Sequence, residues 1–232
     1  MSNAGVIVTG GFGALGTAMA KAFRARGRPV VRIDFLPAPP NTADTFDLGG
    51  VDLTNPEHAS TAMASARAAI GPVAALVNVA GGFTFSHLSE GGPAPWRDMF
   101  EINLLSCVTA TDAALPLLLR SPGAGIVNIG AAAAAQGGPG MGAYTAAKSG
   151  VARFTESLAQ ELALKDITIN AILPSIIDTA ANRRAMPATD PGAWVTPEAV
   201  AEIAAFLLSS AARSISGVLL PVTRGQRFEQ GR

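Results

Sequence analysis

The sequence has few of the residues that build disulfides and metal sites. Of its 232 residues, one is cysteine (Cys107) and two are histidine, so an internal disulfide is excluded and no cluster of metal ligands is visible. Only 15% of the residues are charged, with 17 Lys and Arg against 17 Asp and Glu. Because nucleic acids and anionic membranes attract proteins with a basic excess, neither is an expected partner.

Long hydrophobic runs and a leader segment are also lacking. No apolar run reaches the roughly 18 residues that a membrane-spanning helix needs. The first expected strand starts so close to Met1 that a signal peptide has no room. We therefore expect a soluble, cytoplasmic protein that holds no metal.

What the sequence does contain is a large apolar fraction in alternating patterns. With 232 residues, 49% of them hydrophobic, the chain is long enough for one large core, and we expect a single domain over 1–232. Buried strands alternate with helices throughout, which predicts an α/β fold with a Rossmann-like, doubly wound parallel sheet. The expected strands are 5–10, 29–34, 51–53, 73–81, 125–129, 166–173 and 216–222, and the expected helices are 17–26, 56–70, 96–119, 144–164 and one from 197. Loops are expected at 36–50, 82–95 and 178–193, with a kink or an early helix end at Pro116.

A glycine-rich turn, Gly10 to Gly16, lies between the first strand and the first helix. Glycines in this position let the backbone approach a pyrophosphate, whose charge sits against the helix N-terminus. Asp34 ends the next strand, where a carboxylate accepts hydrogen bonds from an adenosine ribose and repels a 2′-phosphate. NAD(H) is therefore preferred. NADP(H) is not excluded, because Arg32 could either pair with Asp34 or favour the extra phosphate.

A second pattern, Tyr144-Thr-Ala-Ala-Lys148, places a tyrosine and a lysine on one face of a helix. Free tyrosine has a pKa of about 10, and a neighbouring ammonium lowers it, as a tyrosine general acid/base requires. Such pairs are also common on ordinary surface helices, so the rest of the chain must decide. Asn78, inside a buried strand, needs a partner and is expected to hold neighbouring strands together.

Five segments in this order resemble the short-chain dehydrogenase/reductase family over nearly the whole chain. They are the turn Thr9 to Gly16, the strand end Asn78 to Gly81, Asn103, the Tyr144/Lys148 pair, and Pro174 to Thr179. The resemblance implies hydride transfer between a nicotinamide and a small substrate. It assigns acid/base catalysis to Tyr144, Lys148 and Asn103, the last as the anchor of a water in a proton relay.

The same resemblance implies a cofactor site and an assembly. Thr179 and the Ile177 backbone would hold the nicotinamide amide, and Asp52 would meet the adenine edge, with a substrate lid over about 178–195. A homodimer or homotetramer would form through the long helices. The expected cofactor contacts are Gly10, Phe12, Gly13, Ala14, Leu15, Gly16, Asp34, Asp52, Leu53, Asn78, Ala80, Gly81, Tyr144, Lys148, Pro174, Ile177 and Thr179.

Two positions depart from the family pattern. Ala14 replaces the middle glycine of the turn, and Ala131 stands where a serine hydroxyl is expected. Both departures are similar to the dihydropteridine reductase branch of the family. An alanine cannot donate a hydrogen bond to a developing oxyanion, which favours a pterin- or imine-like substrate. Gln136 or Ser175 could supply a substitute hydroxyl or amide.

Two other functions stay open on the sequence alone. One is an ordinary alcohol dehydrogenase or ketoreductase with a relocated hydroxyl donor. The other is a nucleotide-binding sensor that kept the fold without the chemistry. The intact Tyr144, Lys148 and Asn103 weigh against the sensor, because a protein that only binds the cofactor has no need of the tyrosine.

Overall fold

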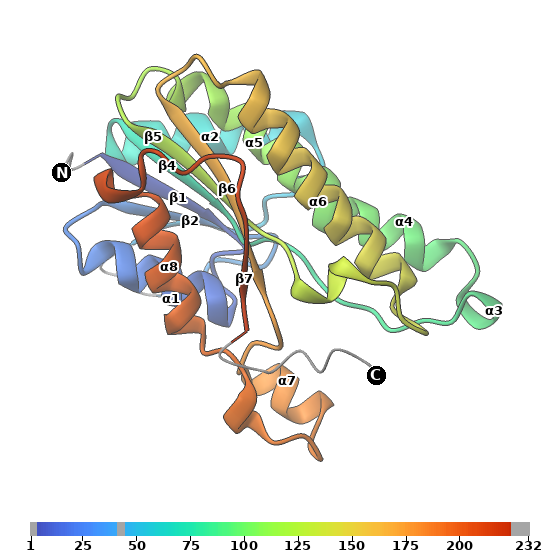
Figure 1. The fold of residues 1–232 in the computed structure, drawn as a ribbon. Helices are drawn as coiled ribbons and strands as arrows, with labels where there is room; N and C mark the ends of the chain where they lie inside the picture. The colour runs from blue at the N-terminus through green and yellow to red at the C-terminus, as the bar shows by residue number, and fades with distance from the viewer. Residues whose placement is uncertain (1–3, 41–44, 224–232) are drawn as a thin grey trace.

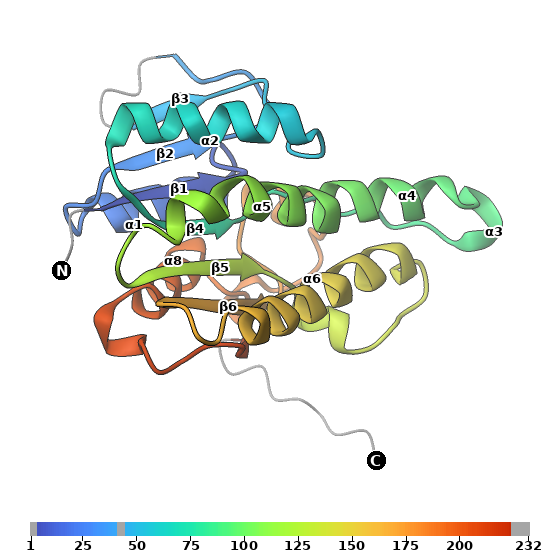
Figure 2. The same cartoon turned by 90° about the horizontal axis from the view of Figure 1, so that it is seen from above.

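The computed structural model describes residues 4–40 and 45–223, and its centre is one parallel sheet. The strand order is β3-β2-β1-β4-β5-β6-β7, and most of this order can be followed from above in Figure 2. The strands are β1 Gly5–Thr9, β2 Val30–Ile33, β3 Phe46–Leu48, β4 Val73–Asn78, β5 Ala124–Ile129, β6 Ile167–Pro174 and β7 Leu219–Val222. The predicted single-domain, doubly wound α/β fold is confirmed.

Helices cover both faces of the sheet, as Figure 1 shows. One face carries α1 Ala14–Arg24 and α8 Pro197–Leu207, and the other carries α2 Pro56–Ile70, α5 Ser106–Leu118 and α6 Gly142–Glu161. Shorter helices are α3 Leu88–Gly91, α4 Ala94–Phe100 and α7 Ala180–Ala185. Within residues 4–40 and 45–223, none of the helices has both the length and the apolarity to cross a bilayer.

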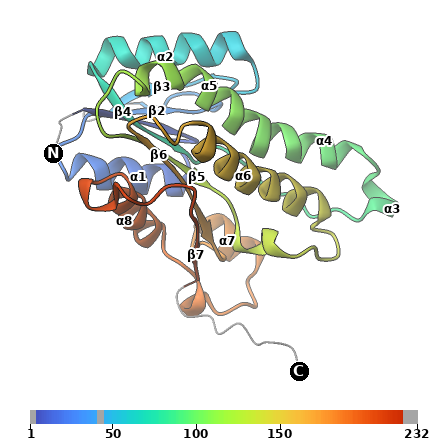
Figure 3. The same ribbon diagram turned by 45° about the horizontal axis from the view of Figure 1, so that its top comes forward.

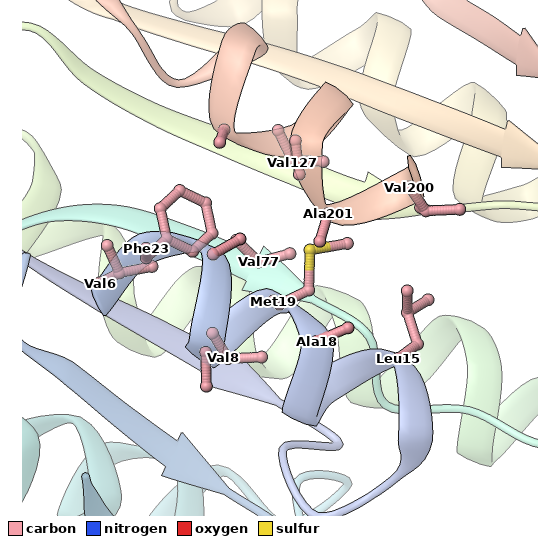
Figure 4. Close-up of a cluster of buried hydrophobic side chains, with 14 of the residues drawn as sticks. Val6, Val8, Leu15, Ala18, Met19, Phe23, Val77, Val127, Val200 and Ala201 are labelled. Atoms are coloured by element: carbon pink, nitrogen blue, oxygen red, sulfur yellow. The ribbon is translucent and has the colours of Figure 1, made fainter. Parts of the chain in front are cut away.

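The core on the α1/α8 side explains why the strands read as continuous apolar runs. Val6 and Val8 of β1 and Phe23 of α1 lie among the labelled side chains of Figure 4 and are at most 1% exposed. Burying a side chain of this size stabilises the fold by about 2–3 kcal/mol. Strands buried on both faces must be apolar on both faces, which is the pattern seen.

The predicted helix starts at residues 56 and 197 are confirmed, and both have side-chain caps. Asn55 Oδ1 accepts hydrogen bonds from the backbone N–H groups of Glu57 and His58, at 2.9 and 3.2 Å. Thr196 Oγ1 accepts from Ala199 N at 3.2 Å. A proline follows each cap, where its missing N–H is not needed.

The expected third strand is wrong in position. The third strand is Phe46–Leu48, which lies inside the stretch predicted as a loop. Residues 51–53, where the strand was predicted, form no strand. The three residues pair in parallel with β2, with Arg32 opposite Asp47. A three-residue strand at a sheet edge shows no usable period, so the pairing partner rather than the local sequence decides its position.

Helices also appear where loops were expected. Residues 82–95 contain α3 and the start of α4, and 178–193 contain α7 and a 3-10 turn, Pro191–Ala193. α5 passes through Pro116 and ends two residues later. The distortion in this long helical stretch is instead a π-helical segment, Glu101–Leu105, which carries Asn103. Such segments are frequent at functional sites.

A buried polar ladder joins two strands and two helices. Asn78 Nδ2 on β4 donates to Asn128 Oδ1 on β5 and to Thr111 Oγ1 on α5, both at 2.9 Å. Asn128 Nδ2 then donates to Thr155 Oγ1 on α6 at 2.9 Å. The expectation that Asn78 holds neighbouring strands together is confirmed, and the ladder extends to the helix that carries Tyr144.

We expect Thr155→Val to lower the free energy of unfolding by about 1–3 kcal/mol, because the buried Asn128 amide loses its acceptor. The matched control is Thr145→Val in the same helix. Both hydroxyls bond a carbonyl one turn back, but only that of Thr155 also accepts from an asparagine. Urea unfolding of the two variants should therefore separate them, and equal losses would contradict the importance of the ladder.

Candidate active site

The functional residues expected from the sequence gather at the carboxyl ends of the strands. The chain order reverses between β1 and β4, and such a switch point opens a crevice in doubly wound sheets. There Thr9 Oγ1 accepts hydrogen bonds from Val79 N and Ala80 N, at 3.1 and 3.2 Å. Gly10 has φ +60°, and a Cβ built on it would lie 2.7 Å from Ala80 N, so two expected cofactor contacts, Gly10 and Ala80, are adjacent.

The geometry of the glycine turn fits a pyrophosphate. A Cβ on Gly16 would lie 2.2 Å from the Gly10 carbonyl oxygen, so glycine is required where helix and turn meet. Gly13 and Ala14 are exposed at the start of α1. The methyl group of Ala14 is therefore compatible with the turn, and the first backbone N–H groups of α1 remain suited to an anion.

Asp34 is directly attached to this turn. Its carboxylate accepts hydrogen bonds from Phe12 N at 2.9 Å and from Leu36 N at 3.1 Å. The Asp34 carbonyl accepts from Val51 N at 3.0 Å, which brings the segment before Asp52 to the same edge. Bonds from the Thr54 hydroxyl and N–H lower the pKa of the Asp52 carboxyl.

Leu15, Leu53 and Asn78 are among the expected contacts whose side chains are buried. Leu15 and Leu53 belong to the two larger core clusters, and Asn78 lies in the polar ladder. These residues can reach a cofactor only through their backbone or a minor part of the side chain. The Asn78 Oδ1 atom is buried and accepts no hydrogen bond from the described residues.

The sequence left open whether Arg32 pairs with Asp34. In the described part of the chain, Arg32 forms its ion pair with Asp47 instead. The Arg32 Nη2 and Nε atoms lie 2.5 and 2.8 Å from the two Asp47 oxygens. Both side chains are more than nine-tenths buried. The sequence analysis missed Asp47 because it lay in an expected loop, and only the β2–β3 register brings it opposite Arg32.

Lys148 and Asn103 meet beside Gly81. Lys148 Nζ donates to the Ile129 carbonyl at 2.8 Å. A Cβ built on Gly81 would lie 2.6 Å from Asn103 Oδ1 and 3.3 Å from Lys148 Nζ. The Asn103 amide also exchanges hydrogen bonds with the backbone of Gly82, at 3.0 and 3.2 Å. Glycine at 81 thus lets both polar side chains reach the crevice edge.

Burial moves the pKa values of the expected acid/base pair in opposite directions. It raises the pKa of the Tyr144 phenol to about 12 and lowers the pKa of the Lys148 ammonium to about 8. The prediction that Lys148 lowers the pKa of Tyr144 is therefore wrong for this structure. A low-dielectric site disfavours the charged form of each group, and this desolvation is the main cause of both shifts.

An aromatic side chain that the sequence analysis did not single out lies against the tyrosine. The Phe83 ring packs edge-on to Tyr144, with ring centroids 5.0 Å apart and planes at 83°, and it is 55% exposed. Its only signal in the sequence is a position just after Gly81 and Gly82. Phe83 forms an apolar wall beside the phenol.

The positions around the missing serine differ in environment. Ala131 is buried in extended backbone just after β5, and Gln136 is exposed. Ser175 follows β6, and its hydroxyl is buried with no hydrogen-bond partner among the described residues. A buried hydroxyl without a partner is rare, so Ser175 is the better candidate for a substitute donor.

The expected nicotinamide segment leads into the stretch expected to form a lid. Pro174 ends β6, and Ile177 pairs with Val195 as an isolated bridge that closes the base of this stretch. Thr179 Oγ1 caps α7 by accepting from Asn182 N at 3.1 Å, and the Ile177 carbonyl accepts from Asn182 Nδ2 at 2.8 Å. The stretch with α7 extends from the body of the fold near the end of β7, as Figure 3 shows.

Residues 4–190 match the family model described as short chain dehydrogenase. Two curated relatives are an inactive 2-(S)-hydroxypropyl-CoM dehydrogenase 2 from Xanthobacter autotrophicus, 33% identical over 76% of this chain and 83% of its own, and the 3-oxoacyl-(acyl-carrier-protein) reductase FabG of Vibrio cholerae, 30% identical over 94% and 95%. The ligand-free aldohexose dehydrogenase of Thermoplasma acidophilum superposes with a TM-score of 0.87 at 27% identity, over 96% of this chain and 93% of that chain.

Because Tyr144 is the only tyrosine in the sequence, its ionisation can be followed directly by tyrosinate absorbance. In the cofactor-free protein we expect half-ionisation near pH 12, so that rapid pH jumps to 11 produce less than about a fifth of the signal that free tyrosine gives. Tyr144→Phe should abolish the absorbance change. A midpoint below 10 would instead show that Lys148 dominates the phenol.

Proposed function

The chain belongs to the short-chain dehydrogenase family of oxidoreductases, and we propose that it is an NAD(H)-dependent enzyme for a small carbonyl, alcohol or C=N compound. The observation that carries this proposal is the site at the switch point. Tyr144 and Lys148 share one face of α6, Lys148 meets Asn103 at Gly81 after β4, and the glycine turn follows the adjacent strand β1. A protein that only bound a nucleotide would have no use for this pair.

Each polar side chain has a distinct task in the proposed reaction. Bound NAD(H) would supply or accept the hydride. Tyr144 exchanges a proton with the oxygen or nitrogen of the substrate. Lys148, whose pKa is lowered to about 8, is suited to pass protons to and from the phenol near neutral pH and to hold the nicotinamide ribose. Asn103 anchors the water through which those protons arrive.

The cofactor would lie along the carboxyl edge of the sheet. Gly10, Phe12, Gly13, Ala14, Leu15 and Gly16 would hold the pyrophosphate, and Asp34 would accept hydrogen bonds from the adenosine ribose. Asp52, Leu53, Asn78, Ala80 and Gly81 would line the adenine and middle portions, and Pro174, Ile177 and Thr179 the nicotinamide. A carboxylate at position 34 favours NAD(H) over NADP(H). Residues 178–195 would cover the substrate.

The substrate we favour needs little stabilisation of a negative oxygen. Losing one oxyanion donor costs a carbonyl reaction about 10²–10³ in rate, and Ala131 has no donor to offer. A quinonoid pterin or an imine places less charge on oxygen. The exposed Phe83 ring beside Tyr144 supports this choice, because it offers a flat apolar wall to a planar substrate.

A second candidate is an ordinary alcohol dehydrogenase or ketoreductase in which Ser175 replaces the missing hydroxyl. The buried, unpartnered Ser175 Oγ favours it, and the Vibrio cholerae relative is itself named a 3-oxoacyl reductase. The Xanthobacter relative named as inactive is a reason to include loss of activity among the outcomes tested.

The assembly we propose is a homodimer or homotetramer. Trp96, Phe100 and Ile102 are each about two-fifths to one-half exposed along the α4–π segment, which packs on α6. In a second copy the same surface would cover them. Light scattering at several concentrations measures this state.

The reaction class is tested by NADH oxidation with quinonoid dihydropterin, cyclic imines and ketones. We expect the pterin or imine to be turned over. We expect Tyr144→Phe to lower kcat by about 10²–10⁴ with NADH affinity within a few-fold, because only the proton transfer is lost. Turnover of ketones alone would contradict the hypothesis of a pterin or imine substrate. NADH binding without turnover of any compound would establish a sensor.

The origin of any ketone activity is tested by two substitutions. If carbonyl reduction is limited by the missing donor, Ala131→Ser should raise ketone kcat by about 10-fold or more. If Ser175 has taken over that task, Ser175→Ala should lower ketone kcat by about 10²–10³, and Ala131→Ser should change little. An unchanged kcat in both variants would show that neither position limits carbonyl chemistry.

A further inference from the structure

The buried ion pair between Arg32 and Asp47 lies at the adenosine end of the proposed cofactor site. The two residues are register partners across β2 and β3, and their contact is bidentate, with Nε–Oδ1 at 2.8 Å and Nη2–Oδ2 at 2.5 Å. The side chains are 8% and 5% exposed. Thr45 Oγ1 also donates to Asp47 Oδ1 at 2.9 Å, which fixes the carboxylate from a second side.

The guanidinium lies directly beneath the glycine turn. A Cβ on Gly11 would lie 2.5 Å from Arg32 Cβ, so only glycine allows this approach. Arg32 Nη1 lies 3.4 Å from the Gly11 carbonyl oxygen, and Cζ lies 5.2 Å from the centre of the Phe12 ring. Phe12 N–H in turn bonds Asp34. The turn therefore contacts both Arg32 and the carboxylate expected at the ribose.

The charges of this group explain how it could reject a 2′-phosphate. Asp34 and Asp47 contribute two negative charges and Arg32 one positive charge. A phosphate monoester brings close to two more negative charges. The guanidinium is the natural bidentate partner of a phosphate, but Asp47 already occupies its Nε/Nη2 edge, and Nη1 bonds the Gly11 carbonyl. A ribose hydroxyl, which is uncharged, meets no such penalty.

We propose that Asp47 is a specificity-determining residue, which selects NAD(H) by holding Arg32 away from the 2′ position of the ribose. The inference rests on the proposed cofactor site and adds a second selector to Asp34. A purely structural role explains the Arg32–Asp47 pair less well, because buried ion pairs can be replaced by apolar residues with little loss of stability. Its placement under Gly11 and Phe12 links it to the cofactor instead.

The test is the ratio of dissociation constants for NADH and NADPH, measured by calorimetry on the intact protein. We expect Asp47→Asn, which is nearly isosteric, to shift this ratio towards NADPH by about tenfold or more, because one opposing charge is removed and the guanidinium is released. In Arg32→Met/Asp47→Leu the shift should be absent, because no guanidinium remains. Asp166→Asn is the control, since it removes a carboxylate that pairs with Arg213 outside the proposed cofactor contacts.

The outcomes separate this inference from the proposed function. If the wild-type protein binds neither cofactor, the proposed function fails. If it binds NADH and a folded Asp47→Asn leaves the ratio unchanged, or the double variant shifts it equally, the role of Asp47 is overturned. Should Asp47→Asn not fold, Arg32→Lys provides the test: an ammonium keeps the charge balance but cannot pair bidentately, and we expect a shift towards NADPH of several-fold.

Discussion

The hydrogen bond from Asn128 to Thr155 fixes the helix that carries the proposed acid/base pair. α6 carries Tyr144 and Lys148, and it is attached to β5 at two points, through Thr155 and through the bond from Lys148 to the Ile129 carbonyl. The partners are buried, so each bond forms in a low dielectric and would be expensive to leave unmade. The helix that carries the proposed acid/base pair, and the Lys148 side chain itself, are thus held by the same strand that leads to Ala131.

Burial that fixes these side chains also sets their protonation. The protein keeps Tyr144 neutral and makes Lys148 a weaker base than it would be in water. Both changes disfavour the charged forms, which are the phenolate of Tyr144 and the ammonium of Lys148. A tyrosine that is neutral at rest suits an enzyme that donates a proton to its substrate. The edge-on Phe83 ring reinforces this dry environment.

The adenosine end shows a different balance between local sequence and tertiary structure. The glycine turn and Asp34 were readable because both are tied to strand ends that the apolar runs predict. Asp47 could not be predicted, because its strand has only three residues and its position is set by pairing with β2. The same pairing decides what Arg32 does. The role of Arg32, which the sequence left open, is thus decided by a buried ion pair with a residue fifteen positions further along the chain.

The sequence by itself determined the parallel α/β fold, the capped helix starts at Pro56 and Pro197, and the order of the segments that meet at one sheet edge. It could do so because buried parallel strands must be apolar throughout and because glycine turns and caps are local requirements. Tertiary structure decided the place of β3, the π segment at Asn103, the pKa values of Tyr144 and Lys148, and the contact with Phe83. The place of β3 depends on its pairing with β2, and the two pKa values depend on the distant residues that exclude water from the site. No local pattern in the sequence records either.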